Sequence, residues 1–290
     1  MIRNPNRALR TETILQGLLL SATAVAVFAV AAIFGFLGYF SLPLFTQGTL
    51  GEIISWHWRP FQGNFGILPM MAGSLILALT ALCLSYPLGL GLCGFVFLFR
   101  RQWPGRLALA LIHFMTSIPT VVYGFVAAFL LVPLVRQVFG QGTGFCWLSA
   151  ALILALLILP TIVLLLHSQT EQLRPQIHLT AMALGFNPAQ EFLSVLLPLS
   201  GRGLAAAAVL GFGRAMGDTL VALMLSGNAP QVPHSPLDSL RTLTAHIALM
   251  VATDSHSLAY HSIFACGLIL FGLAAAVNLT LRWLSPPAKL

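Results

Sequence analysis

The stretch Thr180–Thr219, which reads TAMALGFNPAQEFLSVLLPLSGRGLAAAAVLGFGRAMGDT, decides the fold of this chain. Its first half is turn-rich, and the run GFNP at residues 185–188 predicts that one helix ends and another begins there. Its second half is an apolar helix with two charges, Arg214 and Asp218, and their spacing predicts that both lie on one helix face. The rest of the chain is expected to hold this junction in a membrane.

Composition points to a membrane protein. Hydrophobic residues make up 58% of the 290 residues and charged residues only 7%, whereas soluble domains carry about 25% charged residues. The net charge of +7 comes mainly from basic residues beside apolar runs, so it indicates membrane topology and no nucleic-acid partner. We therefore expect an all-α polytopic membrane protein.

Six apolar stretches predict six transmembrane helices in a single domain, residues 14–283. Residues 1–13 and 284–290 are expected to be cytoplasmic ends, and the polar segment 167–202 a cytoplasmic loop. The first apolar run is too long for a signal peptide, so we expect an uncleaved helix there. The expected spans are about 14–40, 67–99, 107–139, 146–166, 203–225 and 258–281.

The basic residues indicate the orientation, because cytoplasmic loops are enriched in Lys and Arg. Both chain ends and the loops assigned to the cytoplasm hold most of them, and the three expected outer loops hold only Arg59 and Arg241. None of the cytoplasmic segments is long enough to form an ATPase. The residues assigned inside are Arg3, Arg7, Arg10, Arg100, Arg101, Arg106, Arg174, Arg202, Arg282 and Lys289.

Two sets of polar residues interrupt the apolar spans. Pro119 opens the backbone hydrogen-bond ladder of the third span beside Ser117, Thr120 and Tyr123. This kink either serves packing alone or lines a pathway, and the sequence leaves both readings open.

The second set is on the fifth span. An isolated arginine at the bilayer centre costs about 2.5–3.5 kcal/mol, so Arg214 should face protein or water, with Asp218 as its neutralising partner. The pair either fixes helix packing or exposes a guanidinium to a passing anion, with the hydroxyl of Thr219 nearby. The substrate-pathway candidates are therefore Arg214, Asp218, Thr219, Ser117, Thr120 and Tyr123.

The outer segment, the cysteines and the histidines predict no functional site. Residues 240–252 have helical spacing within the long outer segment 226–257 and are expected as a short surface helix. Four cysteines without paired spacing are expected as free thiols, and the irregularly spaced histidines match no metal site. The sequence predicts no bound metal and no cofactor.

At residues 179–198 the chain resembles a known family. Ala181, Gly185, Val195 and the Leu197–Pro198 pair fit the cytoplasmic loop signature of permease subunits of ABC importers, which is Glu-Ala-Ala, three residues, Gly, nine residues, a branched residue, one residue and Leu-Pro. The leading Glu of the signature falls on Leu179. Its absence suggests an asymmetric pair in which the other permease couples more strongly.

Within this family the chain looks most similar to phosphate-specific permeases. They carry runs like SIPTVVYGF (117–125), GRAMGDT (213–219, with Glu usual at the place of Asp218) and SGNAP (226–230). The resemblance covers nearly the whole chain.

The resemblance implies a type I ABC importer permease fold in a bacterial inner membrane. It also implies a second homologous permease, two ATP-binding subunits that carry ATP and Mg, an extracytoplasmic phosphate-binding protein and surrounding lipid as partners. This chain would then be non-catalytic. The residues that would couple it to the ATPase are Thr180, Ala181, Ala183, Leu184, Gly185, Phe186, Asn187, Pro188, Leu197 and Pro198.

The function expected from these observations is a permease subunit of an ATP-driven phosphate importer. Three alternatives stay open: a permease for another oxyanion such as phosphonate, sulfate or molybdate, an ion-coupled secondary carrier, and a sensor or scaffold in which the Arg214–Asp218 pair is purely structural. A secondary carrier would predict internal repeats, and the two halves of the chain show no convincing one.

Overall fold

The computed structural model describes residues 5–46, 51, 54–251 and 258–284. The chain forms two compact units, residues 1–50 and 51–290. The first unit holds helix α1 (Pro5–Thr46). Its stretch Ile14–Leu42 is long and apolar enough to cross a membrane, and it coincides with the first expected span.

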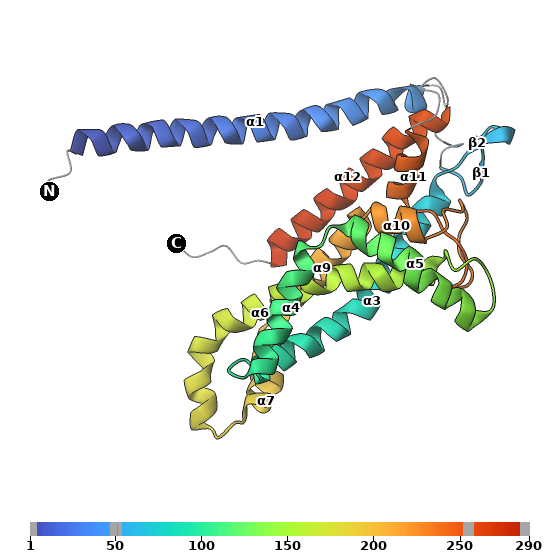
Figure 1. Cartoon of the computed structure of the whole chain (residues 1–290). Helices are drawn as coiled ribbons and strands as arrows, with labels where there is room; N and C mark the ends of the chain where they lie inside the picture. The colour runs from blue at the N-terminus through green and yellow to red at the C-terminus, as the bar shows by residue number, and fades with distance from the viewer. Residues whose placement is uncertain (1–4, 47–50, 52–53, 252–257, 285–290) are drawn as a thin grey trace. The chain divides into compact units, whose positions relative to one another are not determined.

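The second unit is a bundle of helices with a small β-hairpin at the end opposite α7 (Figure 1). We refer to these as the hairpin end and the α7 end. Its elements are β1 (Trp58–Arg59), a 3-10 turn (Pro60–Gln62), β2 (Asn64–Phe65), α3 (Leu68–Leu98), α4 (Trp103–Ser117), α5 (Thr120–Phe139), α6 (Trp147–Ala183), α7 (Pro188–Gln190), a π-helical turn (Glu191–Leu196), α8 (Leu197–Leu199), α9 (Gly201–Gly217), α10 (Leu220–Leu225), α11 (Leu243–Met250) and α12 (Leu258–Leu284).

Within the described residues, five helices are long and apolar enough to cross a membrane. A sixth span is counted if Pro188–Leu199 and Gly201–Gly217, bent by 75° against each other, form one crossing. The predicted all-α polytopic fold is confirmed. The other four single-helix spans are Leu68–Leu98, Thr120–Phe139, Trp147–Ala183 and Ser262–Trp283.

The core of the second unit lies where α3, α6 and α9 pack together (Figure 1). Small residues allow these helices to approach closely. A Cβ atom at Gly89 of α3 would lie 2.8 Å from the Cγ2 atom of Ile162, and one at Gly211 of α9 would lie 3.1 Å from the same side chain. Ile162 of α6 is therefore clamped between two glycines from neighbouring helices.

Helix α6 is longer than the expected fourth span. It continues past Leu166 to Ala183, so the first half of the segment predicted as a loop, 167–202, is helical. A helix of 37 residues extends about 55 Å, well beyond the roughly 30 Å hydrocarbon core of a bilayer. A hydropathy pattern predicts only the apolar part of a helix. It does not predict how far the helix continues into polar sequence.

The third expected span is broken in two. We call Ile118–Pro119 the first helix break, because α4 ends at Ser117 and α5 begins at Thr120. Pro119 disfavours helical geometry at the preceding residue, and Ile118 is extended with a ψ of 125°. The sequence predicted a kink in one helix, and the structure instead has two helices.

The fifth expected span is also broken, and the prediction of one shared face for Arg214 and Asp218 is wrong. Helix α9 ends at Gly217, and Asp218 is extended with a ψ of 125°. Its Oδ1 atom accepts a hydrogen bond of 2.9 Å from the N–H of Val221 in the first turn of α10. Short acidic side chains compete with the helical ladder in this way. We call Asp218–Thr219 the second helix break.

The helix predicted near 240–252 is present as α11, but its first half, residues 243–246, is buried and does not lie on the surface. His246 is fully buried, its Nε2 atom lies 3.2 Å from Ser262 Oγ, and its ring packs edge-on against Trp58 at 4.4 Å. Burial lowers the pKa of His246 to about 3, helped by the positive charge of Arg241. This helix is thus part of the packed hairpin end.

The loop before α11 is ordered by its own hydrogen bonds. The Asp238 carboxylate accepts the N–H groups of His234 and Ser235 at 2.9 and 2.8 Å, which lowers the pKa of that carboxyl group. The backbone carbonyl of Asp238 accepts the N–H of Trp147 at 2.9 Å. The loop therefore also caps the first turn of α6.

Candidate functional site

Two regions gather the residues that the sequence singled out. One is the 180–198 segment at the α7 end, and the other lies around the two helix breaks inside the apolar part of the bundle.

The 180–198 segment reverses the chain through two helix caps. At the end of α6, the N–H of Phe186 donates to the carbonyl of Ala181 at 3.0 Å, and Gly185 has a positive φ of 75° that glycine adopts without strain. At the start of α7, Asn187 and Gln190 form a reciprocal capping box, with distances of 2.8 and 3.0 Å. The turn predicted at GFNP is therefore present and well defined.

The apolar side chains of this segment divide into an exposed and a buried set. Met182 and Leu184 are 61 and 67% exposed, and Leu179, just before the segment, is 76% exposed. Phe192, in contrast, is 5% exposed and packs on Phe97 of α3 with ring centroids 5.3 Å apart. Phe192 thus holds the second half of the segment on the bundle, whereas the exposed side chains of the first half form an apolar surface of the kind that marks protein contacts.

The other predicted residues of this segment differ in their exposure. Ala181 is buried beneath the turn and Leu197 is half-buried, whereas Pro198 is exposed. The predicted residues that are exposed with the apolar turn are Thr180, Ala183, Gly185, Asn187 and Pro188, and Phe186 is 37% exposed.

A buried carboxylate fixes the second half of the segment to α6. Glu191 is 3% exposed, and its two oxygens lie 3.1 and 3.0 Å from the Nδ1 atom of His178. The Nε atom of Arg174 lies 3.9 Å from the same carboxylate, and its guanidinium lies 5.8 Å from the centre of the Phe97 ring. Sequence reasoning missed this cluster. The i, i+4 spacing of Arg174 and His178 was the available signal, since it places two basic groups on one helix face.

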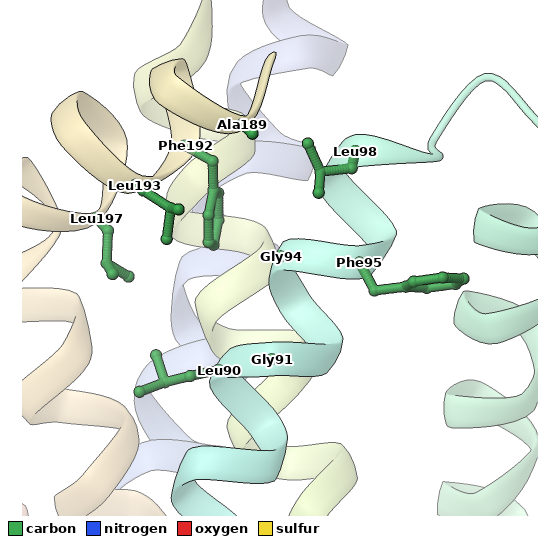
Figure 2. A pocket seen from close by; sticks show the side chains of 9 residues that line it. All are labelled: Leu90, Gly91, Gly94, Phe95, Leu98, Ala189, Phe192, Leu193 and Leu197. Atoms are coloured by element: carbon green, nitrogen blue, oxygen red, sulfur yellow. The ribbon is translucent and has the colours of Figure 1, made fainter. Parts of the chain in front are cut away.

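Beside this cluster a groove runs along the cytoplasm-assigned end of α3. Figure 2 shows the side chains of Phe192, Leu193 and Leu197 facing the α3 backbone at Gly91 and Gly94. The groove has a volume of about 370 Å³. Its lining is apolar throughout: Leu90, Gly91, Gly94, Phe95, Leu98, Ala189, Phe192, Leu193 and Leu197.

The first helix break is spanned by a tyrosine. The hydroxyl of Tyr123 in α5 donates to the carbonyl of Met115 in α4 at 3.0 Å, and it satisfies a carbonyl near the end of that helix. Ser117 bonds within its own helix, to the carbonyl of His113 at 3.5 Å. Thr120 is half-buried at the first position of α5.

At the second helix break, Arg214 and Asp218 are near each other without forming an ion pair. No contact of 4.0 Å or less between their charged atoms is found in the part of the chain that the structure describes. Arg214 is exposed, and its charge acts electrostatically on both Asp218 and Tyr123. The expected neutralising pair is thus a looser arrangement that leaves the guanidinium accessible.

Packing brings the two breaks together. Helix α5 packs against α10, and a Cβ atom at Gly124 would lie 2.7 Å from Met224 Sδ. The carbonyl of Asp218 accepts the hydroxyl of Thr244 in α11 at 3.0 Å, and Thr219 is half-buried beside it. The structure therefore groups Tyr123, Arg214 and Asp218, while Ser117 and Thr120 lie at the first break.

Over the described residues, no three His, Cys, Asp or Glu side chains are arranged to hold a metal ion. Cys83, Cys93, Cys146 and Cys266 are free. The functional groups present at the two helix breaks are one accessible guanidinium, one carboxylate and several hydroxyl groups, all in apolar surroundings.

Residues 85–289 match the family model described as binding-protein-dependent transport system inner membrane component. The chain is 32% identical to a probable ABC transporter permease protein, YqgH, of Bacillus subtilis, over 92% of this chain and 89% of that protein. It is 27% identical to the phosphate transport system permease protein PstC of Pasteurella multocida, over 79% of this chain and 78% of that protein. PstC of Mesorhizobium japonicum is 26% identical, over 95% of this chain and 87% of that protein.

Among solved structures, the chain is similar to one from the MetNI methionine ABC transporter in an inward facing conformation. The TM-score is 0.58 at 15% identity, over 79% of this chain and 100% of that chain. This likeness concerns the fold. The resemblance that the loop signature and the membrane motifs indicated is confirmed by these matches.

Proposed function

The chain belongs to the binding-protein-dependent transport inner membrane components, and from this premise we propose that it is the permease subunit of an ATP-driven phosphate importer. As a member of that family it is a multi-pass inner membrane protein and a non-catalytic subunit of an ABC importer. The transporter to which it belongs also has a separate ATPase and a binding protein. An ion-coupled carrier is no longer an alternative.

The observation that carries the phosphate assignment is the accessible Arg214 at the second helix break. A guanidinium presents a planar set of donors that matches the oxygens of a tetrahedral anion, and in an apolar setting its charge is weakly screened. Named PstC relatives support the same assignment. Arg214 would bind the anion, with the hydroxyl of Thr219 in the same helix break, whereas the hydroxyl of Tyr123 already donates to the Met115 carbonyl.

Asp218 gives the proposed site a way to release its substrate. Its negative charge already interacts with Arg214 across a gap wider than an ion pair. An arriving phosphate would compete with that interaction and would itself be repelled by the carboxylate. Conduction needs binding that is weak enough to reverse, and this arrangement meets that need.

The 180–198 segment is the proposed contact with the ATPase. Its exposed Met182 and Leu184, together with Leu179 just before it, form an apolar surface at the tip of a projecting helix, and the Glu191 cluster holds the segment to α6. We place this end and both termini on the cytoplasmic side, where the basic residues gather. Closure of two ATPase subunits would then move α6 and α9 as a unit. The second homologous permease and a phosphate-binding protein outside complete the proposed assembly.

Competition measurements test the substrate. The assembled transporter, purified through this chain and reconstituted with its binding protein, should take up labelled phosphate, and unlabelled phosphate should compete far better than sulfate, molybdate or a phosphonate. Uptake suppressed by one of those other anions, with no effect of phosphate, would assign the site to that anion and reject the phosphate proposal. The nearby relative YqgH, whose name gives no substrate, makes this the necessary control.

A further inference from the structure

The apolar groove beside the 180–198 segment continues into a basic pocket. The pocket has a volume of about 240 Å³, and it shares Leu98 with the groove. Neighbouring residues line the two spaces in turn: Pro188 and Glu191 face the pocket, and Ala189 and Phe192 face the groove. The groove and the pocket therefore lie next to each other along the end of α3 and the 180–198 segment.

The pocket carries an excess of positive charge. Arg100, Arg101, Arg174 and His178 line it against one carboxylate, Glu191, which is already held by His178. The Nε atom of Arg174 is buried without a hydrogen-bond partner. Arg100 forms a 3.8 Å contact with the half-exposed Glu171, and such surface pairs contribute little. An anion in this pocket would meet Arg100 and Arg101, whereas Arg174 is also paired with Glu191.

Arg100 and Arg101 also border a second hollow at the α3–α4 turn. That space, about 360 Å³, adds Arg106 and His167 as basic groups and Glu171 as the acidic one. Trp103 follows the turn and is 74% exposed. Exposed tryptophan next to arginines is typical of the headgroup level of a bilayer.

We propose that the end of α3 and the 180–198 segment together bind one anionic phospholipid, whose phosphate lies among Arg100, Arg101 and Arg174 and whose acyl chain lies in the groove along α3. An apolar groove joined to a basic pocket at this level fits a phospholipid better than a free anion, which would leave the groove unused. Basic pockets between helices on the cytoplasmic side are established lipid headgroup sites. The lipid would contact Phe192 and thereby support the segment proposed to engage the ATPase.

This inference rests on the proposed orientation, with the α7 end toward the cytoplasm, and not on the identity of the transported anion. Its test reads lipid binding directly, so failure of the phosphate assignment would leave it standing. The assembled transporter is placed in nanodiscs of phosphatidylglycerol and phosphatidylethanolamine, released gently and weighed by native mass spectrometry with its bound lipids.

Two kinds of variant separate headgroup from acyl chain. Gly91→Leu fills the groove, since a Cβ atom there meets nothing within 4 Å. Arg100→Gln with Arg101→Gln removes headgroup charge. Each arginine should weaken phosphatidylglycerol retention about fivefold, and Gly91→Leu should abolish it. Matched controls in α12, Gly272→Leu and Arg282→Gln, should retain the lipid like the wild type.

Retention unchanged in Gly91→Leu would overturn the proposal. The proposal would also be overturned if only the arginine variants lost the lipid and inorganic phosphate displaced it from the wild type. The pocket would then be a site for a free anion. Because a variant can fail to assemble, the wild type carries a second test. A phosphatidylglycerol with a photoactivatable acyl chain should crosslink within residues 90–98 or 189–197, and a phosphatidylcholine analogue should not. Equal labelling by both lipids, or labelling elsewhere only, would also reject the site.

Discussion

The two regions where the chain departs from regular helix treat their polar groups in opposite ways. In the 180–198 segment the buried carboxylate of Glu191 is held at 3.0 Å by His178, and the turn is closed by a two-sided capping box. At the second helix break, Arg214 is exposed and has no ion pair within 4.0 Å in the described part of the chain. Satisfied polar groups make a segment rigid, whereas an unsatisfied guanidinium remains available to a ligand. This contrast fits the proposal that the first region transmits a movement and that the second meets an anion.

The largest stability effect is expected from the rigid region. Glu191→Gln removes a buried charge from between His178 and Arg174, and breaking such a cluster costs about 3 kcal/mol. Hydrogen exchange of residues 188–199 should accelerate, and ATP hydrolysis should continue with little transport. Glu171→Gln is the matched control, because its 3.8 Å contact with Arg100 is half-exposed and worth under about 0.5 kcal/mol. Equal effects of the two changes would remove the distinction between a rigid and an available region.

The hairpin end should respond to acid. The second helix break is held from this end by Thr244, two residues from the buried His246. The folded pKa of His246, about 3, lies below its usual 6.5, so the folded state favours the neutral ring. This contribution to stability is complete above pH 6.5 and is lost as pH falls from there toward 3, by up to about 1.4 kcal/mol per pH unit.

Thermal melting of the purified transporter at about pH 7.5 and about pH 5 measures this loss, expected at roughly 2 kcal/mol. His246→Gln should flatten the pH dependence. The exposed His113, which lies 2.8 Å from the Leu109 carbonyl, provides the control, since His113→Gln should leave the slope unchanged. An unchanged slope in His246→Gln would show that other groups govern acid sensitivity.

A smaller effect is expected from the cap at the turn. Asn187→Ala removes the side chain that accepts the N–H of Gln190 at 2.8 Å, which costs about 1 kcal/mol. Exchange of the Gln190 amide should rise about fivefold. Asn278→Ala, in which an exposed asparagine bonds only to the Ala274 carbonyl of its own helix, should not alter it. If the Gln190 amide exchanged no faster in Asn187→Ala, tertiary packing alone would order the turn.

Sequence reasoning was most reliable where local chemistry decides the backbone. The turn at 185–188 and the interruption at Pro119 follow from residue types whose backbone preferences are strong. The shared face of Arg214 and Asp218 was wrong because a spacing of four places residues together only if the helix continues, and Asp218 instead caps the next helix.

Contacts set by chain reversal were beyond the sequence. Glu191 meets His178 across thirteen positions, so their proximity depends on the turn at Gly185. The helical pattern of α11 was visible, but whether it was covered depended on Trp58 and Ser262, which come from distant elements. Whether a short apolar helix is buried depends on the elements that pack around it. The helical periodicity of its sequence does not predict that packing.

The most direct test of the account is uptake of labelled phosphate, measured together with ATP hydrolysis, in transporters carrying Arg214→Gln or the matched control Arg136→Gln, an exposed arginine in the last turn of α5. Arg214→Gln should assemble and hydrolyse ATP, but its phosphate uptake should fall at least about tenfold, since a charge-assisted contact of about 1.5–3 kcal/mol is removed. Arg136→Gln should transport normally. Normal uptake in Arg214→Gln would contradict the account, because the guanidinium would then lie off the path of the anion and serve packing alone.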